Sequence, residues 1–214
     1  MNADILILQE AGQPGEAADT TRVAWFPVTG RVGVAVVTRN GFKVQPSDGP
    51  GGLVACHAVE VSGPERFSVL AVWTQQKDGY ISGLAADLDR CSDWMAGREV
   101  VIAGDFNSNA IWDKASRPAD HSRVVARLER EFGLISAYHA ALGVAQGAEP
   151  HATHYWRWQE ANPFHLDYFF VPTAWKVCNV SVGEFAPWAH VSDHRPVIVD
   201  VEIRPSSCCG GHGE

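Results

Sequence analysis

Two polar residues directly after an apolar run could hold a cation and activate water. Asp105 and Asn107 follow the apolar run 100–103 and Gly104. The run is short and rich in β-branched residues, which predicts a strand that is buried on both faces. A carboxylate and an amide two residues apart at the end of such a strand can both reach a metal ion, a water molecule or a phosphate oxygen. The alternative for this motif alone is an ordinary Asp/Asn turn.

Acidic residues take similar positions at three further places in the chain. Glu10 follows the apolar run 5–8, Asp167 lies in the aromatic segment 165–171, and Asp193 is followed directly by His194. Carboxylate oxygens are the ligands that hard divalent cations prefer, and histidine titrates near neutral pH. The set therefore predicts a metal site with an acid or base beside it. The alternatives are a surface glutamate at position 10 and a structural histidine at position 194.

As a set, these motifs resemble those of the endonuclease/exonuclease/phosphatase superfamily, also called deoxyribonuclease-I-like. The order and spacing of the motifs agree with the family over nearly the whole chain. The matching residues are Gln9-Glu10, Gly104-Asp105-Phe106-Asn107, Asp167-Tyr168-Phe169 and Ser192-Asp193-His194-Arg195-Pro196. The resemblance implies an α/β fold, a two-sheet α/β/β/α sandwich, and a metal-dependent hydrolase that acts on phosphoester bonds.

The resemblance also implies which residues hold the metal. Glu10 and Asp193 are expected to bind a divalent cation. Magnesium takes only one or two protein carboxylates and keeps several waters, so that two acids are sufficient. Manganese suits the same oxygen ligands. The expected cofactor is therefore Mg²⁺ or Mn²⁺.

The remaining motif residues are expected to perform the chemistry. Asp105 would orient or deprotonate the attacking water, and Asn107 would hydrogen-bond the phosphate oxygens as charge builds on them. His194 would serve as general base or as a donor to the phosphate. The family's partner for this histidine, which fixes its tautomer, is the acid at the position of Asp167.

Three further residues are candidates for contact with the substrate. His165 stands where relatives often have an arginine, and the alternative is a half-buried strand histidine. Trp112, Tyr155, Trp156 and Phe164 lie in segments that frame the pocket in relatives, where aromatic rings could stack on a base or sugar. The selected candidates are His165, Trp112 and Trp156. For Trp156, packing in the core is the favoured alternative.

Two long periodic segments predict helices between the strands. Residues 80–95 carry apolar side chains at helical spacing. A second helix is expected to start at a cap formed by Asp120 or Ser122 and to end at Gly133. Short strands with some helices between them fit two sheets packed face to face with helices outside.

The strand pattern predicts one strand, one hairpin and one missing strand. Residues 32–38 form a strand, and residues 153–158 are expected to form a hairpin with 165–171. In the family an earlier strand ends in an asparagine before the glutamate strand. No such strand precedes Glu10, so that the sheet is expected to lack the family's first strand.

Composition and charge limit the class of protein. The chain has 214 residues, 46% of them hydrophobic, which fits one folded domain over 1–204 with a disordered tail at 205–214. No apolar run approaches the ~20 residues of a membrane span, and no signal peptide is visible. Five cysteines without paired spacing fit reduced thiols in the cytoplasm.

The net charge of −8 argues against a tight, non-specific grip on DNA. It does not exclude a phosphodiester substrate, because an acidic site attracts a cation that then receives the phosphate. The first hypothesis is hydrolysis of phosphodiester bonds in nucleic acid or a nucleotide-like molecule by in-line attack of water. The alternatives are a phosphomonoesterase acting on a small or lipid-like phosphate, and an N-terminally shortened, non-catalytic phosphate-binding module.

Overall fold

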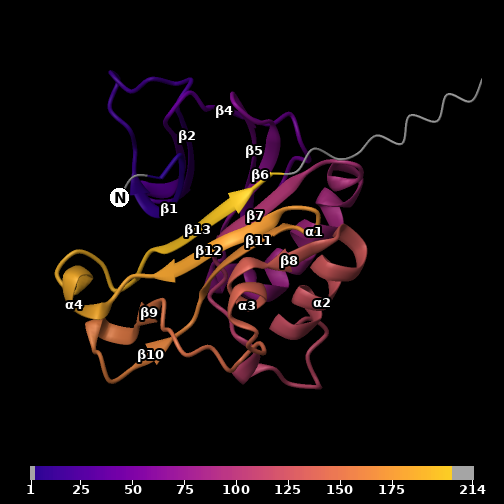
Figure 1. The fold of residues 1–214 in the computed structure, drawn as a ribbon, viewed down its shortest axis with the longest axis vertical. Coiled ribbons are helices and arrows are strands. Elements are labelled where there is room, and N and C mark those ends of the chain that lie inside the picture. The colour runs from indigo at the N-terminus through magenta and orange to yellow at the C-terminus, as the bar shows by residue number, and fades with distance from the viewer. Residues whose placement is uncertain (1–2, 204–214) are drawn as a thin grey trace, which may run out of the picture.

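The computed structural model describes residues 3–203, and its central feature is a six-stranded sheet (Figure 1). Strands β6 and β7 run parallel, and the other neighbouring pairs are antiparallel. The parallel pair brings the ends of two buried strands to the same edge of the sheet, where Trp73 pairs with Asp105. In sheet order the strands are β4 (Lys43–Pro46), β5 (Cys56–Ser62), β6 (Phe67–Trp73), β7 (Val100–Asp105), β11 (Asp167–Pro172) and β8 (Leu134–Ser136).

Helices α1 (Ile81–Met95) and α2 (His121–Phe132) cover one face of this sheet. Their apolar stripes, which include Leu84, Leu88 and Leu128, are fully buried against it. The side chain of Asp120 caps α2 by accepting a hydrogen bond from the Arg123 amide at 3.0 Å. Both helices predicted from periodicity are therefore confirmed.

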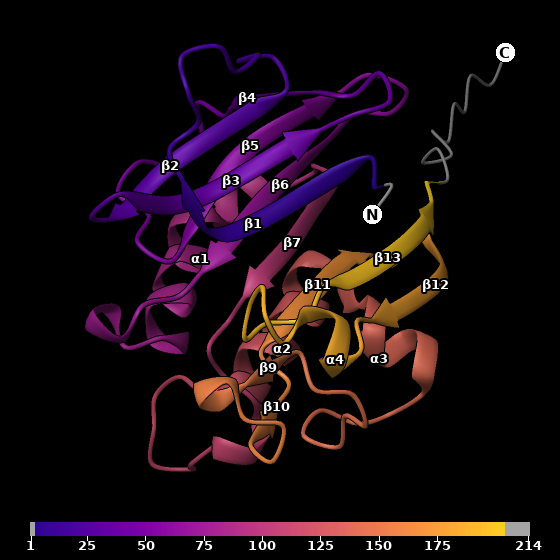
Figure 2. The same cartoon turned by 90° about the vertical axis from the view of Figure 1, so that its left-hand side faces the viewer.

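The opposite face of the sheet carries a second β layer in two pieces (Figure 2). One piece has the order β1-β3-β2, and the other pairs β12 with β13. Within residues 3–203, β1 pairs only with β3 and β13 only with β12. The bounds are β1 (Ile5–Gly12), β2 (Val23–Thr29), β3 (Val32–Thr38), β12 (Lys176–Val182) and β13 (Val197–Glu202). Mixed α/β architecture with two packed β layers confirms the predicted fold class.

The predicted hairpin between 153–158 and 165–171 is wrong. Only two short strands pair there, and the later segment instead enters the large sheet, where Asp167 pairs with Asp105. Alternation identifies a strand but not its partner, and here the partner lies far away in the sequence. The short strands are β9 (His154–Tyr155) and β10 (Pro163–Phe164).

Several short helical elements complete the fold. α3, which was not predicted, packs against β11 and β12. Across the described part of the chain, no helix has the length and apolar character needed to cross a membrane. The predicted tail at 205–214 lies outside the described residues. The bounds are η1 (Gln76–Asp78), η2 (Ala110–Trp112), α3 (Ala137–Leu142), η3 (Trp156–Trp158) and α4 (Phe185–Trp188).

His57 on β5 stacks on Phe26 of β2, with ring centroids 4.6 Å apart, and so joins the two layers. Burial lowers the pKa of His57 to about 4, although Asp87 opposes the shift. The usual value is about 6.5, so that between these values the unfolded chain binds a proton that the folded chain does not. The contribution of His57 to stability is therefore fully present above about pH 6.5 and is lost progressively as the pH falls from about 6.5 to about 4.

This titration predicts an acid sensitivity that a single substitution removes. In denaturant unfolding, the titration of His57 should lower the free energy of unfolding by about 1–2 kcal/mol when the pH is changed from about 7.5 to about 5. His57→Phe keeps a ring that can stack on Phe26. Its free energy of unfolding should fall by about 1–2 kcal/mol less than that of the parent between these two pH values. His190→Gln is the control, because His190 is exposed. Equal losses in the parent and in His57→Phe would contradict the assignment.

Candidate active site

Asp105 ends β7 and is held in a fixed orientation. The side chain is only 3% exposed. Its two oxygens accept hydrogen bonds from the backbone amide of Asn107 at 2.8 Å and from the Asn107 side-chain amide at 2.6 Å. The same Asn107 nitrogen also donates to the carbonyl of Thr74 at 3.2 Å. Both hydrogens of this amide are therefore used inside the site, so that Asn107 orients Asp105.

Gly104 lets β1 cross closely over β7. The side chain of Gln9 donates to the Val72 carbonyl at 3.1 Å, directly above this glycine. A Cβ at position 104 would collide with Val72 O and would lie 2.6 Å from Gln9 Nε2, and the φ of +136° favours glycine. The next residue of β1, Glu10, has a φ of 54° and lies in a bulge of the strand. Bulges re-aim side chains next to active sites.

Gly104→Ala should destabilise the protein strongly, because both close neighbours come from other strands. The free energy of unfolding should fall by about 3 kcal/mol or more, since strain and steric overlap add. Gly12→Ala in β1 is the matched control, because a Cβ there meets nothing within 4 Å. The prediction fails if denaturant unfolding shows the same stability for both variants.

His194 and Asp167 form a hydrogen-bonded pair beside Asp105. The Nδ1 atom of His194 lies 2.9 Å from Asp167 Oδ2. Asp167 is itself positioned by its pairing with Asp105 across the sheet and by Thr153, whose hydroxyl accepts from the Asp167 amide at 3.0 Å. This pair fixes the orientation of the imidazole and leaves Nε2 for a substrate or ion.

The carboxylates around this histidine change the ionisation of the site. Burial, followed by the charge of Asp167, raises the pKa of Asp105 to about 8, and Glu10 adds to the increase. Burial alone lowers the pKa of His194, but Asp167 and then Asp105 and Asp193 outweigh it and raise the pKa to about 9. The structure therefore brings together the four acids and the histidine that the sequence selected.

This concentration of negative charge fits a hard divalent cation. The carboxylates of Glu10 and Asp193 offer oxygen ligands, and Glu10 is close enough to Asp105 to raise its pKa. A group of mutually repelling carboxylates is stabilised by a doubly charged ion, and Mg²⁺ and Mn²⁺ both accept oxygen ligands. That Glu10 and Asp193 hold such an ion together stays a prediction.

His154 lies next to the site and was not among the predicted residues. It is 8% exposed, and its ring lies 4.6 Å from that of His194. Its Nε2 atom is 3.7 Å from Asp193 Oδ2. Thr74 and Thr153, which orient Asn107 and Asp167, were also missed. None of these residues belongs to a motif, and only the tertiary structure shows their position.

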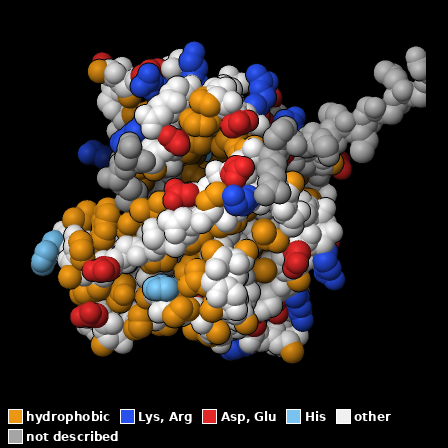
Figure 3. Space-filling view, viewed as in Figure 1, with side chains coloured by type: hydrophobic (Ala, Val, Ile, Leu, Met, Phe, Trp, Pro, Cys, Tyr) orange, Lys and Arg blue, Asp and Glu red, His pale blue; other side chains and the backbone are white. Residues whose placement is uncertain are grey.

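Exposed aromatic side chains extend from the site. Trp112 is 40% and Trp156 54% exposed, so that the core position favoured for Trp156 is wrong. Four rings form a continuous row. The distances between ring centroids are 5.1 Å for Trp112 and Phe164, 6.4 Å for Phe164 and His154, and 6.2 Å for His154 and Trp156. Figure 3 shows hydrophobic side chains gathered where Figure 1 places β9, β10 and α4. We call Trp112, Phe164, His154 and Trp156 the aromatic rim.

His165, the third predicted substrate contact, lies away from solvent. It is 4% exposed and packs between the rings of Tyr138 and Tyr168, at 4.5 and 5.0 Å. Its Nδ1 atom bonds to the carbonyl of His151 at 2.8 Å. A side chain enclosed in this way has no surface to offer a substrate, and His165 is therefore not among the proposed substrate contacts.

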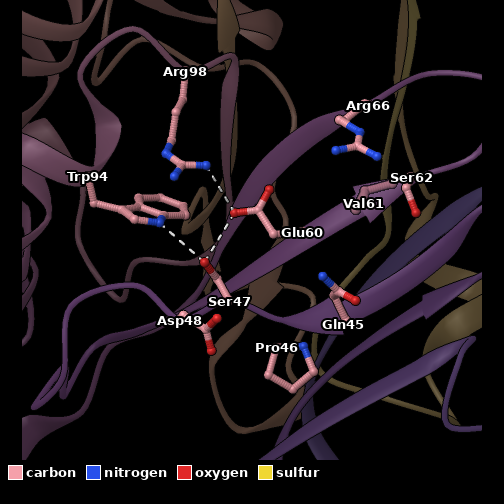
Figure 4. A pocket seen from close by; sticks show the side chains of 10 residues that line it. All are labelled: Gln45, Pro46, Ser47, Asp48, Glu60, Val61, Ser62, Arg66, Trp94 and Arg98. Atoms are coloured by element: carbon pink, nitrogen blue, oxygen red, sulfur yellow. Dashed lines mark hydrogen bonds and ion pairs between the residues drawn. The ribbon is translucent and has the colours of Figure 1, made fainter.

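A hollow lined by Glu60, Trp94 and Arg98 lies at the other end of β6 (Figure 4). Glu60 accepts hydrogen bonds from Ser47 at 3.1 Å and from Arg98 at 3.4 Å, and Trp94 donates to Ser47 at 3.2 Å. The polar groups of the hollow therefore form hydrogen bonds with one another. They lie at the start of β6, whereas the end of β6 adjoins Asp105. The hollow is therefore separate from the candidate active site.

The fold is similar to solved structures of two nucleases and a phosphatase. The 3'-5' exonuclease NExo from Neisseria meningitidis superposes with a TM-score of 0.64 at 20% identity, covering 94% of this chain and 90% of that chain. The 3' phosphatase NExo from Neisseria bound to a product DNA hairpin gives 0.62 at 19%, covering 94% and 89%. The endonuclease domain of TRAS1, a telomere-specific non-LTR retrotransposon, gives 0.62 at 16%, covering 94% and 87%. At these identities the likeness concerns the fold.

Sequence comparison identifies the family itself. No curated protein matches the chain at a significant level. A model of the Endonuclease/Exonuclease/phosphatase family, in contrast, matches residues 1–194. This match contains every residue of the candidate site, from Glu10 on β1 to His194 after α4. The chain therefore belongs to the Endonuclease/Exonuclease/phosphatase family.

Proposed function

We propose that the chain is a Mg²⁺- or Mn²⁺-dependent phosphoesterase that hydrolyses phosphodiester bonds in nucleic acid or a nucleotide-like molecule. The observation that supports this most is the His194–Asp167 pair, with its 2.9 Å hydrogen bond, placed beside the buried and oriented Asp105. Family membership adds to this support. Acid–base groups that act on water next to carboxylates are what in-line displacement at phosphorus requires.

Each residue of the site has a defined task in this proposal. Asp105 accepts the proton of the attacking water, and Asn107 holds that carboxylate in place. Asp167 keeps Nδ1 of His194 occupied, so that Nε2 donates a hydrogen bond to the phosphate as charge builds on it. A divalent cation held by Glu10 and Asp193 would supply further stabilisation of negative charge on the phosphate and the leaving oxygen.

The aromatic rim favours a substrate with bases. Its two exposed tryptophans offer faces on which bases can stack, at about 1–3 kcal/mol per base. Two similar structures are described as an endonuclease domain and as a phosphatase bound to DNA. Stacking is independent of net charge, so that the charge of −8 is compatible with this binding.

The rim makes a specific prediction. With a single-stranded DNA oligonucleotide and Mg²⁺, Trp112→Ala and Trp156→Ala should each raise KM by about 5- to 150-fold, the equivalent of about 1–3 kcal/mol. Trp158→Ala is the control, because Trp158 is 49% exposed in the same η3 segment but lies outside the rim. If Trp158→Ala raises KM as much as the two rim variants do, the rim has no special role.

Hydrolysis of a monoester is the second candidate function. The acidic charge of the chain favours it, and NExo is described as a 3' phosphatase. Metal-dependent hydrolysis of a chromogenic phosphodiester and of the corresponding monoester separates the two functions. We expect faster hydrolysis of the diester, and faster hydrolysis of the monoester would overturn that choice. Calorimetric metal binding without hydrolysis of either substrate would instead indicate the non-catalytic phosphate-binding module.

We also propose that the protein works in a reducing compartment such as the cytoplasm. Cys56 and Cys91 are buried thiols in the same core cluster, and neither forms a disulfide. Buried free thiols are typical of proteins that fold under reducing conditions. Thiol titration of protein purified from its natural source under non-reducing conditions tests this, and oxidised Cys56 or Cys91 would contradict it.

A further inference from the structure

His154 is a buried imidazole without a hydrogen bond to match its burial. Its Nδ1 atom is buried and has no hydrogen-bond partner among the described residues. Its Nε2 atom lies 3.7 Å from Asp193 Oδ2, which is longer than a hydrogen bond. Buried polar groups in folded proteins are nearly always paired, and an exception points to a bound water or ion. Within the described residues, no hydrogen bond holds the ring of His154, and its Nε2 atom, which faces Asp193, is available to an ion.

Two other donors lie close to His154. One ligand atom from each of His154, Asp193 and His194 can be chosen so that all three lie within 4.8 Å of one another. Such a triangle can close around an ion with small side-chain rotations, since Zn²⁺ binds nitrogen and oxygen at about 2.0–2.2 Å. Two imidazole nitrogens and one carboxylate oxygen form a donor set that differs from the all-oxygen set preferred by Mg²⁺.

The backbone holds these three residues on a rigid platform. The amide of Tyr155 donates to the carbonyl of Asp193 at 2.8 Å, and the amide of Arg195 donates to that of Thr153 at 2.7 Å. These bonds flank a β-bridge between His154 and His194. The two segments that carry the donors are thus locked together before any ion binds. Preorganisation of this kind lowers the cost of binding.

One of the donors also has the outer-shell partner that metal sites use. His194 bonds through Nδ1 to Asp167 at 2.9 Å, which leaves Nε2 for an ion. A histidine that binds a metal through one nitrogen usually donates the other N–H to a carboxylate or carbonyl, which fixes the tautomer. The Asp167–His194 pair has this arrangement.

We propose that His154, Asp193 and His194 form a binding site for a borderline divalent cation, with Zn²⁺ as the preferred ion. Zn²⁺ accepts mixed nitrogen and oxygen ligands and binds such sites more tightly than Mn²⁺ does. Because Asp193 and His194 also belong to the candidate active site, Zn²⁺ bound here withdraws both residues and inhibits hydrolysis. Only this consequence rests on the proposed function; the binding site does not.

The test measures zinc binding by the full chain without substrate. The sequence contains Cys208, Cys209 and His212, which can bind zinc by themselves. The parent for the experiment therefore carries Cys208→Ser and Cys209→Ser. Competition with a chromogenic zinc chelator should detect one tight Zn²⁺ site in this parent. Absence of that site would overturn the proposal.

Variants then locate the site. His154→Gln should weaken Zn²⁺ binding by about tenfold or more, because a ligand is lost. His190→Gln is the matched control, an exposed histidine close in sequence, and should bind Zn²⁺ as the parent does. Unchanged zinc affinity in His154→Gln would overturn the proposal. Thermal unfolding checks that the variant is folded, and if it is not, Asp193→Asn takes its place with the same expected loss.

The titration also separates this inference from the proposed function. It uses Zn²⁺ alone and contains no phosphoester, so that an enzyme without measurable hydrolysis still gives a valid result. Conversely, a parent that hydrolyses phosphodiesters but binds no Zn²⁺ retains the proposed function and contradicts the zinc site.

Discussion

His194→Ala should lower the kcat of Mg²⁺-dependent hydrolysis by about 10²–10⁴-fold, the usual effect of removing a positioned proton donor or acceptor. The side chain is half-buried, and its Nδ1 atom is held by Asp167 at 2.9 Å. Alanine removes the imidazole that we propose donates to the phosphate, and it leaves the Asp167 carboxylate without this partner. Initial rates on a phosphodiester at saturating substrate measure the loss.

The control for this variant is His190→Ala, because His190 is exposed. Its kcat should equal that of the parent. Thermal unfolding of His194→Ala in the presence of EDTA checks that the variant is folded. A folded His194→Ala enzyme that keeps the parent rate with Mg²⁺ present would show that the histidine has no part in the chemistry.

Asp105→Asn should lower kcat by about 10²–10⁴-fold, because an amide does not accept the proton of the attacking water. The substitution keeps the size of the side chain and an oxygen that can accept the Asn107 amide hydrogen, which now bonds at 2.8 Å. It also removes the repulsion from Asp167 and Glu10 that helps to raise the pKa of Asp105 to about 8.

The stability of Asp105→Asn provides the second measurement. Loss of charge repulsion favours the folded variant, whereas the new amide faces the side-chain nitrogen of Asn107, which now donates to Asp105 at 2.6 Å. These effects oppose each other, and we expect the free energy of unfolding in EDTA to change by about 1 kcal/mol or less. Parent-like kcat in a folded variant would exclude Asp105 as the base.

Local sequence features predicted most of the elements. The strand β3 has the predicted bounds of 32–38, and α1 and α2 lie where periodicity and caps place them. The hairpin involving β11 was wrong because alternation carries no information about a partner in β7. The short helix α3 was missed because the segment after β8 is apolar without a clear helical period.

The residues of the candidate site that belong to sequence motifs could be predicted. Acids at the ends or edges of apolar strands were predicted to form one site, and the pairing of Asp105 with Asp167 shows how the sheet brings two of them together. Contacts that depend on tertiary packing could not be predicted from the sequence. The burial of His165 and the short distance between the rings of His154 and His194 depend on irregular segments, which have no periodic pattern. The use of both Asn107 hydrogens inside the site likewise depends on the position of Thr74 on a neighbouring segment.

The central claim is that Asp167 acts through His194 in one phosphoesterase site, and a double-mutant cycle tests it most directly. Single-turnover hydrolysis of a single-stranded DNA oligonucleotide with Mg²⁺ is measured for the parent, Asp167→Asn, His194→Ala and the double variant. Residues that act as a unit are non-additive, so that the double variant should be no slower than His194→Ala alone. Losses that multiply in the double variant, or a parent without Mg²⁺-dependent hydrolysis, would contradict the account.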